Sequence, residues 1–263
     1  LRANSGKTSK DFSVIMVTGI RVIVGIIGNA ICLLLYAAPI LTFKRVIKEA
    51  TVGEFSCIPY ILAFFSALTW TWYSLPIVST GWENLSVASI SSIGILFELS
   101  FISIYIWFAP GGKKKYVTLM VSVVLAIFGV TVFFSTFRIH NHHTRKLFVG
   151  SIGIVTSMSM YSSPLVAVKQ VIRTKSVEFM PFYLSLFSFL TSAIWMVYGI
   201  LARDPYLTSP NCVGCFTGLL QLVVYCIYSR CKENEPSKSL KDVEQANDMQ
   251  FVTSREDADG YKP

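Results

Sequence analysis

Seven long apolar segments, separated by short polar stretches, run through most of the chain. Six of them contain no Asp, Glu, Lys or Arg, and the other contains Glu98 as its one charged residue. The segments are Val22–Phe43, Phe55–Trp82, Asn84–Gly112, Tyr116–Phe137, Leu147–Val168, Phe179–Ala202 and Pro205–Ser229. Each is long enough for the roughly 20 apolar residues that a membrane-spanning helix requires. Because backbone polar groups in lipid must hydrogen-bond within their own segment, the pattern predicts an all-α integral membrane protein with seven spans.

Composition agrees with a membrane protein and separates the two ends from the apolar part. Of the 263 residues, 53% are hydrophobic and 14% are charged, whereas about 25% are charged in a soluble protein. Residues 1–17 form a polar arm without the pattern of a signal peptide. Residues 231–263 form a polar tail of mixed charge, which is typical of a disordered segment.

The basic residues of the loops predict the orientation. Loops on the cytosolic side of a membrane carry an excess of Lys and Arg. Nine basic residues lie in the three loops of one side: Lys44, Arg45, Lys48, Lys113, Lys114, Lys115, Lys169, Arg173 and Lys175. The other side has Arg138, Arg145, Lys146 and Arg203. We therefore expect the N-terminus outside and the C-terminal tail in the cytosol. The glycosylation sequon at Asn84 falls on the predicted outer side.

The chain repeats itself at an offset of 125 residues. The matched pairs are Gly25 and Gly150, Gly28 and Gly153, Pro39 and Pro164, Lys44 and Lys169, Trp70 and Trp195, and Tyr73 and Tyr198. A further segment matches at an offset of 120, where Ser91 corresponds to Asn211 and Gly94 to Gly214. The first three predicted helices therefore repeat as the last three, and the fourth has no counterpart.

The unmatched helix sets the topology. A three-helix repeat crosses the membrane an odd number of times, so a linker helix is needed to bring the second repeat back to the direction of the first. We expect a first repeat over residues 18–110, a linker helix over 113–138 and a second repeat over 146–230, a 3+1+3 architecture. Parallel repeats are related by an axis along the membrane normal, and their substrate binds near mid-bilayer at the interface. The duplication favours a carrier of two halves.

Three motifs resemble those of the SWEET family of sugar transporters, most closely its plant members. They are KSVEFMPF at residues 175–182, Y-x-S-P at residues 161–164, and GN…AP…TFKR at residues 28–45. The resemblance covers about residues 19–228. It implies a bidirectional uniporter for mono- or disaccharides that works by alternating access, without a cofactor. It also implies a homo-oligomer, a trimer or a dimer, in the plasma membrane or an intracellular membrane.

The resemblance assigns the prolines Pro39, Pro59, Pro164 and Pro181 to a hinge at the inner gate. Proline removes a helical hydrogen bond and clashes with the preceding turn, so each marks a kink or the start of a helix. The simpler interpretation is that Pro59 and Pro181 only begin helices.

The repeated tryptophans Trp70 and Trp195 are the first candidates for sugar contact. An aromatic ring stacks on the apolar face of a sugar, and the indole N–H can donate a hydrogen bond. The alternative for a buried tryptophan is core packing. Asn211 offers amide donors and an acceptor to sugar hydroxyls, although it could instead join helices. The family has an asparagine in each repeat, whereas here Ser91 takes the first place, which puts substrate affinity in doubt.

Three further repeat pairs match pocket positions of the family. They are Cys32 and Ser157, Leu35 and Met160, and Ser66 and Thr191. The residues of each repeat have the spacing of one helix face. Relatives that favour sucrose carry smaller, valine-like residues at the Leu35 and Met160 positions. We therefore expect a smaller cavity here and a hexose such as glucose as the substrate, with a sucrose-preferring uniporter as the alternative.

Glu98 and three residues at the outer helix ends complete the candidate set. An acidic residue inside a span is a functional hypothesis by default. We expect Glu98 to be a gate or interhelical residue near a Lys or Arg of an inner loop, with proton coupling as the alternative. Tyr73, Tyr198 and Asp204 are predicted to form an outer gate.

Other function classes lack the residues that they require. A receptor predicts no duplication and an outer disulfide, for which the cysteines are poorly placed. A retinal protein needs a lysine within its last helix, and Pro205–Ser229 contains none. The sequence shows no nucleophile–base pair within the membrane, as an enzyme would require. It shows no charged ring or filter, as an ion channel would require. The Cys212 and Cys215 pair stands alone, so no metal site is expected. Sugar and lipid are the expected partners, and nucleic acid is not.

Overall fold

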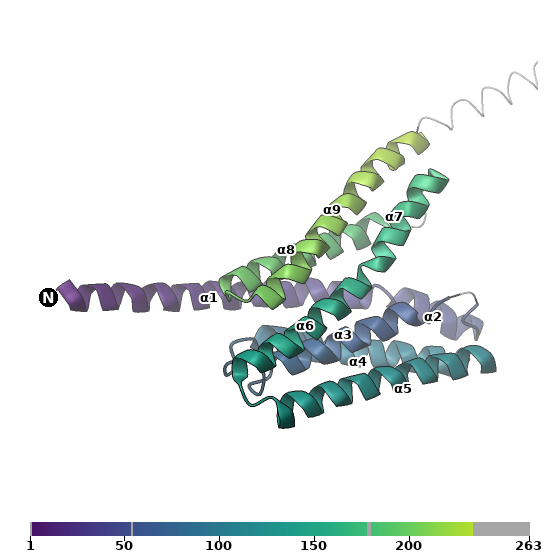
Figure 1. Ribbon diagram of the computed structural model, residues 1–263. Coiled ribbons are helices and arrows are strands. Elements are labelled where there is room, and N and C mark those ends of the chain that lie inside the picture. The colour runs from purple at the N-terminus through teal and green to yellow at the C-terminus, as the bar shows by residue number, and fades with distance from the viewer. Residues whose placement is uncertain (1, 54, 178–179, 234–263) are drawn as a thin grey trace, which may run out of the picture.

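The computed structural model describes residues 2–53, 55–177 and 180–233, which form helices joined by short loops (Figure 1). In chain order these are α1 (Arg2–Ala37), α2 (Ile40–Glu49), α3 (Ile58–Ser74), α4 (Leu85–Phe108), α5 (Gly111–Phe133), the π-helical turn η1 (Phe134–Arg138), α6 (His142–Met160), α7 (Ser162–Thr174), α8 (Phe182–Leu201) and α9 (Pro205–Glu233). No strand occurs within the described residues, and the predicted all-α class is confirmed. Most of the predicted tail, residues 234–263, and residues 178 and 179 of the KSVEFMPF motif lie outside the described part.

Six helical segments of the described residues are long and apolar enough to cross a membrane. Two of them are broken helices, because α1 with α2 and α6 with α7 each make one span. The seventh predicted span is α3, whose 17 residues match the lower end of the range of about 17–25 residues for a spanning helix. Residues 2–17 of the predicted polar arm form the first part of α1, which is continuous from Arg2 to Ala37.

The first span of each repeat breaks within a few residues of the equivalent position. Ala38 and Pro39 form a turn between α1 and α2. Tyr161 separates α6 from α7, and Pro164 is the third residue of α7. A proline at a helix start is tolerated, whereas within a helix it removes a backbone hydrogen bond. The prolines therefore explain why neither span is one uninterrupted helix.

The helices pack as two three-span bundles that share an interface. In the first repeat α4 contacts both α1 and α3, and in the second α9 contacts both α6 and α8. Across the interface α1 contacts α8, and α3 contacts α6. The linker helix α5 packs on α3 and α4 of the first repeat. Its terminal turn η1 is also tied to α3, where the Trp72 indole donates to the Ser135 hydroxyl over 3.0 Å.

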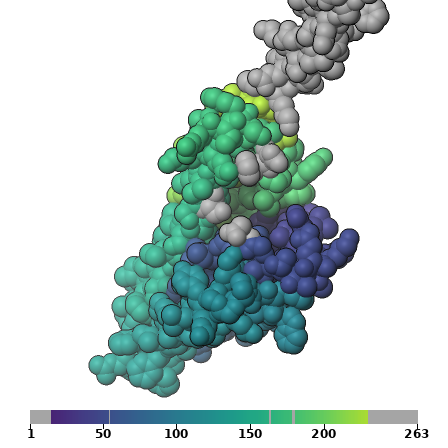
Figure 2. Space-filling view, turned by 90° about the vertical axis from the view of Figure 1, so that its right-hand side faces the viewer, coloured from purple at the N-terminus to yellow at the C-terminus, as the bar shows by residue number. Residues whose placement is uncertain are grey.

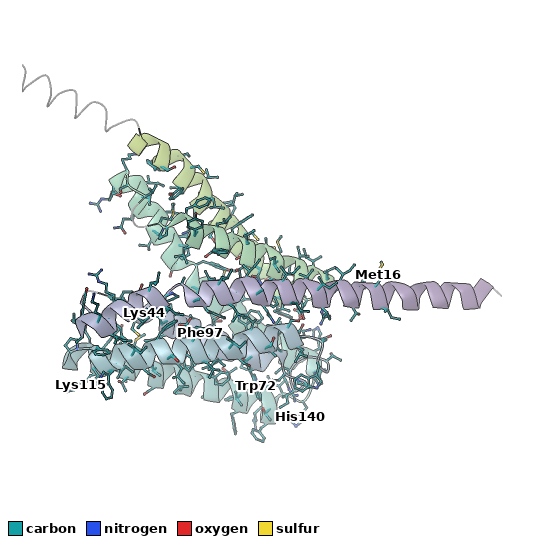
Figure 3. The ribbon with its side chains drawn as sticks, turned by 180° about the vertical axis from the view of Figure 1, so that it is seen from behind. Met16, Lys44, Trp72, Phe97, Lys115 and His140 are labelled. Atoms are coloured by element: carbon teal, nitrogen blue, oxygen red, sulfur yellow. The ribbon has the colours of Figure 1, made fainter. Side chains whose placement is uncertain are left out.

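The two ends of the bundle differ in shape. Figure 3 shows Lys44 and Lys115 at one end, here called the basic end, and Trp72 and His140 at the other. At the basic end, α7 and the end of α9 rise away from α2 and α5 (Figure 1). The space-filling view of the basic end shows a hollow between the green surface of the second repeat and the blue and teal surface of the first (Figure 2). At the opposite end the repeats meet, and we call it the tyrosine end after Tyr73 and Tyr198.

Candidate functional site

A cavity of about 140 Å³ lies between the two repeats. Its twelve lining residues form six pairs, each related by the offset of 125 or 120 residues that the sequence repeat predicts. The pairs are Cys32 and Ser157, Tyr36 and Tyr161, Trp70 and Trp195, Val87 and Leu207, Ile90 and Pro210, and Ser91 and Asn211. The cavity therefore lies on the pseudo-two-fold axis of the molecule, where parallel repeats place their substrate.

The two tryptophans reach across the interface in a symmetrical exchange. Trp70 of the first repeat donates its indole N–H to the hydroxyl of Ser157 in the second, over 3.0 Å. Trp195 of the second repeat is a hydrogen-bond partner of Cys32 in the first. Each ring is thereby fixed by the partner repeat and lines the cavity. A fixed aromatic face can stack on a sugar ring.

Two glycines make this exchange possible. A Cβ atom on Gly153 would lie 3.0–3.3 Å from the Trp70 ring, and one on Gly28 would lie 3.3 Å from the Trp195 ring. Such separations are closer than ordinary carbon contacts of about 3.5–4.0 Å. The absence of a side chain therefore lets α1 and α6 approach the tryptophans of the opposite repeat.

The polar groups of the cavity are unevenly divided. Asn211 stands on α9, where its side-chain nitrogen donates to the carbonyl of Leu207 over 2.7 Å. Pro210 precedes it within the helix and supplies no N–H of its own. Ser91, the counterpart on α4, is a hydroxyl-bearing residue that is 7% exposed. The second repeat thus offers an amide where the first offers a hydroxyl.

Tyr36 and Tyr161 line the cavity, whereas the predicted Leu35 and Met160 do not. A helix turns about 100° per residue, so Tyr36 lies about 40° from Cys32 and Leu35 about 60° to the other side. The tyrosine hydroxyls fit against glycines, because a Cβ atom would collide with Tyr36 at Gly94 and with Tyr161 at Gly214. Tyr161 is also a hydrogen-bond partner of Ser192. The identity of the two tyrosines at the repeat offset is the sequence signal that would have found them.

Ser66 and Thr191 also lie outside the cavity. Ser66 is buried, and the hydroxyl of Thr191 is buried without a hydrogen-bond partner. Each stands one turn before its tryptophan. Of the ten predicted binding residues, the structure therefore gathers six: Cys32, Trp70, Ser91, Ser157, Trp195 and Asn211.

The tyrosine end is closed by a buried network around Asp204. The Tyr73 hydroxyl donates to this carboxylate over 2.8 Å, and the Lys146 ammonium lies 2.8 Å from it. The side chain of Asp204 is 1% exposed, and it also accepts the backbone N–H of Tyr206 at the start of α9. Lys146 lies 5.7 Å from the centre of the Tyr73 ring. The network therefore joins α3 of the first repeat to α6 and α9 of the second.

A weaker set of contacts around Tyr198 is the counterpart of this network at the tyrosine end. Arg21 lies 5.2 Å from the centre of the Tyr198 ring, and the Tyr198 hydroxyl donates to the backbone carbonyl of Glu83 over 3.2 Å. Arg21 and Lys146 are 125 residues apart, and Asn84 and Asp204 are 120 apart. Neutral Asn84 therefore stands where the second repeat has its buried acid. Asn84 is 1% exposed, so the predicted sequon is not accessible in this conformation.

The predicted prolines lie toward the basic end, in two roles. Pro39 and Pro164 lie at the broken spans. Pro59 is the second residue of α3, and Pro181 is the N-cap of α8, so these two begin helices. A second cavity, of about 560 Å³, is lined by Pro59 of the first repeat and by Met160 of the second.

Glu98 corrects one expectation. It is buried in α4 at 6% exposure, and within the described residues it has no ion pair, so the predicted Lys or Arg partner is wrong. Its electrostatic neighbours are Tyr36, Cys57 and Tyr60, and its Oε2 atom has no hydrogen-bond partner. The repeat counterpart is Gly218, so this acid belongs to the first repeat alone.

Comparison with known proteins gives matches over most of the chain. A family model described as "Sugar efflux transporter for intercellular exchange" matches residues 22–113 and 147–233, which hold the two repeats. The bidirectional sugar transporter SWEET3a of Oryza sativa subsp. japonica is 66% identical over 94% of this chain and 100% of that protein. SWEET3 of Arabidopsis thaliana, also named a bidirectional sugar transporter, is 49% identical over 83% of each chain. A solved structure of a eukaryotic SWEET transporter, 35% identical, superposes with a TM-score of 0.78 over 82% of this chain and 99% of that one.

Proposed function

Because the chain belongs to the SWEET family of sugar transporters, we propose that it carries a hexose such as glucose in both directions across a membrane, by alternating access and without ion coupling. The observation that carries the proposal is the cavity between the repeats. Six pairs of equivalent residues line it, and the Tyr73–Asp204–Lys146 network closes it at one end.

The size of the cavity favours a hexose over a disaccharide. A volume of about 140 Å³ is small beside the roughly 300–1,000 Å³ of pockets for drug-sized ligands. Tyr36 and Tyr161 occupy the cavity wall with bulky rings. A disaccharide such as sucrose, with two rings, needs more room than these tyrosines leave.

The lining chemistry suits a sugar. Trp70 and Trp195 offer aromatic faces to the C–H surface of the ring. Asn211, Ser91 and Ser157 offer hydrogen-bonding groups to its hydroxyls. Ser66, Thr191, Leu35 and Met160 stand outside the cavity, so we assign them a supporting role at most.

The two unlike ends support alternating access. Opening the tyrosine end requires Tyr73 and Lys146 to release Asp204, and closing the basic end requires α2 and α7 to swing inward. Pro39 and Pro164 lie at the breaks where such bending needs the least disruption of helical hydrogen bonds. Pro59 and Pro181 fix the helix starts that face those breaks.

The proposed setting is the plasma membrane with the tyrosine end outside. Lys44 and Lys115 lie at the opposite end (Figure 3), and the excess of positive charge there supports a cytosolic position for it. The resemblance to the family supports a homo-oligomer, a dimer or a trimer.

A proton-coupled carrier is the second candidate, and Glu98 is the observation that favours it. A buried carboxylate with an unpaired oxygen could exchange a proton during transport. Glu98 does not line the central cavity, so coupling would have to act through a neighbour such as Tyr36.

Uptake of labelled glucose and sucrose by yeast that lacks hexose transporters tests the proposal, with and without a protonophore. We expect glucose uptake that survives the protonophore and is lost in Trp195→Ala and Asn211→Ala at equal surface expression. Uptake of sucrose alone would contradict the hexose preference. Two results together would favour proton coupling and overturn the uniport proposal: the protonophore abolishes uptake by the wild type, and uptake by Glu98→Gln survives the protonophore.

A further inference from the structure

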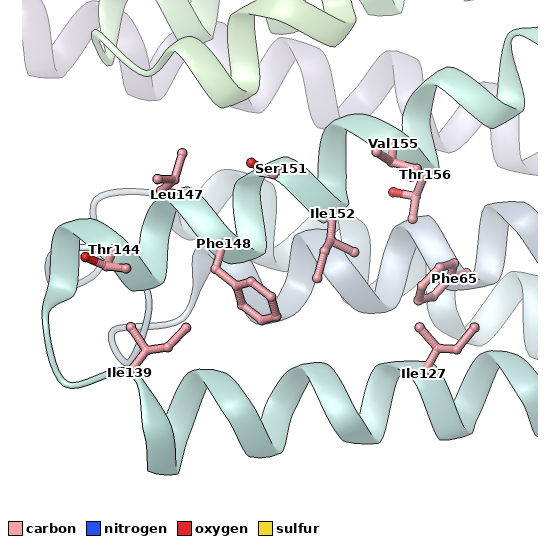
Figure 4. A pocket seen from close by; sticks show the side chains of 10 residues that line it. All are labelled: Phe65, Ile127, Ile139, Thr144, Leu147, Phe148, Ser151, Ile152, Val155 and Thr156. Atoms are coloured by element: carbon pink, nitrogen blue, oxygen red, sulfur yellow. The ribbon is translucent and has the colours of Figure 1, made fainter.

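A third hollow, larger than the two cavities described above, lies on the outside of the bundle, between the linker helix α5 and α6. Its volume is about 750 Å³. Figure 4 shows Ile127 of α5 and Ile139, which follows η1, on one side of it, and Phe148 and Ile152 of α6 on the other. Phe65 of α3 forms part of its lining. We call this the linker groove.

The linker groove is a consequence of the 3+1+3 architecture. The linker helix packs on α3 and α4 of the first repeat, and no second linker exists to cover α6 of the other. Large apolar side chains along the groove are exposed: Ile127 is 47%, Leu147 45% and Val155 64% exposed. The polar hydroxyl of Thr156 is satisfied internally by the carbonyl of Gly153. The groove is thus an apolar surface within the membrane-spanning part.

The length of the groove matches one leaflet of a bilayer. On α6 the lining runs from Thr144 to Thr156, and on the other side from Ile127 to Ile139. The twelve steps from Thr144 to Thr156 along α6 rise about 18 Å, whereas half of a hydrocarbon core is about 15 Å. A neighbouring protein helix would be about 10 Å wide and would continue across the whole bilayer. An extended acyl chain fits the length and the chemistry better.

The groove also ends beside positive charge. Ile139, at its end near the loop between η1 and α6, stands between Arg138 and His140 in the chain, and both of these are exposed. Basic residues at the membrane surface attract lipid phosphate groups. We propose that the linker groove binds one acyl chain of a phospholipid from the leaflet at the tyrosine end, with the phosphate at Arg138.

Such a lipid gives α6 a deformable neighbour. When Lys146 at the start of α6 releases Asp204, α6 can shift relative to α5 without opening a void, because a fluid chain follows the change in shape. The bound lipid is therefore expected to persist while the gate opens and closes.

Native mass spectrometry of the full chain, purified in detergent and titrated with phosphatidylglycerol, tests the proposal. Ile127→Trp fills the groove, and Leu125→Trp is its matched control, because both residues are 47% exposed on α5 and only Ile127 lines the groove. We expect wild type and Leu125→Trp to keep one tightly bound lipid per chain. Ile127→Trp should bind that lipid at least tenfold more weakly, and Arg138→Gln should weaken it less.

Equal lipid binding by both tryptophan variants would overturn the proposal. So would a wild-type chain that keeps no lipid, or a change of oligomeric state in Ile127→Trp alone, since the groove would then be a protein interface. If Ile127→Trp does not fold, Val155→Trp fills the groove from α6 and replaces it. Glucose uptake by each variant reports folding and is a separate readout from lipid binding.

Discussion

At the scale of single residues, the site is built from exchanged contacts. Gly28, Cys32 and Arg21 of α1 meet Trp195 and Tyr198 of the other repeat. The equivalent residues of α6 meet Trp70 and Tyr73 in the same way. Each repeat therefore holds the aromatic groups of the other, and no single repeat has a complete cavity.

The close contact at Gly153 predicts a sensitive position. Gly153→Ala places a methyl group against the Trp70 ring, and overpacking of this kind costs about 1–3 kcal/mol. We expect lower thermal stability and slower glucose uptake, because the ring must move toward the cavity. Gly129→Ala on α5 is the control, since a Cβ atom there meets nothing within 4 Å. Equal behaviour of the two variants would show that α6 and Trp70 are not closely packed.

The tyrosines of the cavity predict its selectivity. Tyr36→Val with Tyr161→Val enlarges the cavity, and we expect sucrose uptake to appear or to rise at least tenfold relative to glucose. Leu35→Val with Met160→Val changes residues outside the cavity and should leave the sucrose-to-glucose ratio within twofold. Uptake of both sugars by both double variants decides which pair controls size. The reverse outcome would restore the assignment made from the sequence.

The difference between these two pairs shows what the sequence could predict at this scale. The repeat offset identifies Trp70, Trp195 and Asn211 without coordinates. Spacing from Cys32 does not distinguish Leu35 from Tyr36, because both lie about one turn away. The identity of Tyr36 and Tyr161 at the repeat offset favours the tyrosine, and the packing of Tyr36 on Gly94 settles which residue faces inward.

At the scale of elements, apolar length predicted the spans well and their interruptions less well. Prolines indicate where the first span of each repeat breaks, because proline lacks a backbone N–H and its position is read directly from the sequence. The start of α1 at Arg2 and the shortness of α3 depend on what surrounds those segments, so composition alone does not predict them. The prediction of a Lys or Arg partner for Glu98 was wrong for the same reason, because the burial of Glu98 by α1 and α3 depends on tertiary packing.

The link between α3, α6 and α9 predicts how the closed end can be opened. Lys146→Met leaves the Asp204 carboxylate without its cation. Removing one partner of a fully buried pair costs about 3–5 kcal/mol, and we expect about 2–3 kcal/mol here because the Lys146 side chain is 27% exposed. The equilibrium should shift toward an open tyrosine end by at least tenfold.

Labelling of Cys32 measures this shift, because that thiol lines the cavity. In a chain that retains Cys32 as its one cysteine, an impermeant maleimide applied from outside should react at least tenfold faster in Lys146→Met. Lys115→Met removes the same charge at the basic end and should leave the rate unchanged. Unchanged labelling in Lys146→Met would mean that Asp204 does not hold the tyrosine end closed.

At the scale of the whole molecule, the sequence repeat becomes a symmetry of structure with defined exceptions. The family match to residues 22–113 and 147–233 confirms the predicted 3+1+3 plan, and family membership confirms a transporter rather than an enzyme. The exceptions are Ser91 opposite Asn211, Asn84 opposite Asp204 and Glu98 opposite Gly218. In each of these pairs, only one repeat has the more polar or the charged residue. We therefore expect the two repeats to move unequally.

Counterflow of glucose in proteoliposomes tests the central claim, that one cavity opens alternately to the two sides. Vesicles loaded with unlabelled glucose are diluted into labelled glucose, with no pH gradient and with Trp195→Ala as the inactive control. Alternating access predicts that unlabelled glucose inside transiently accelerates entry of the label and drives its accumulation above equilibrium. Entry that is indifferent to sugar on the far side would contradict alternating access and indicate an open pore.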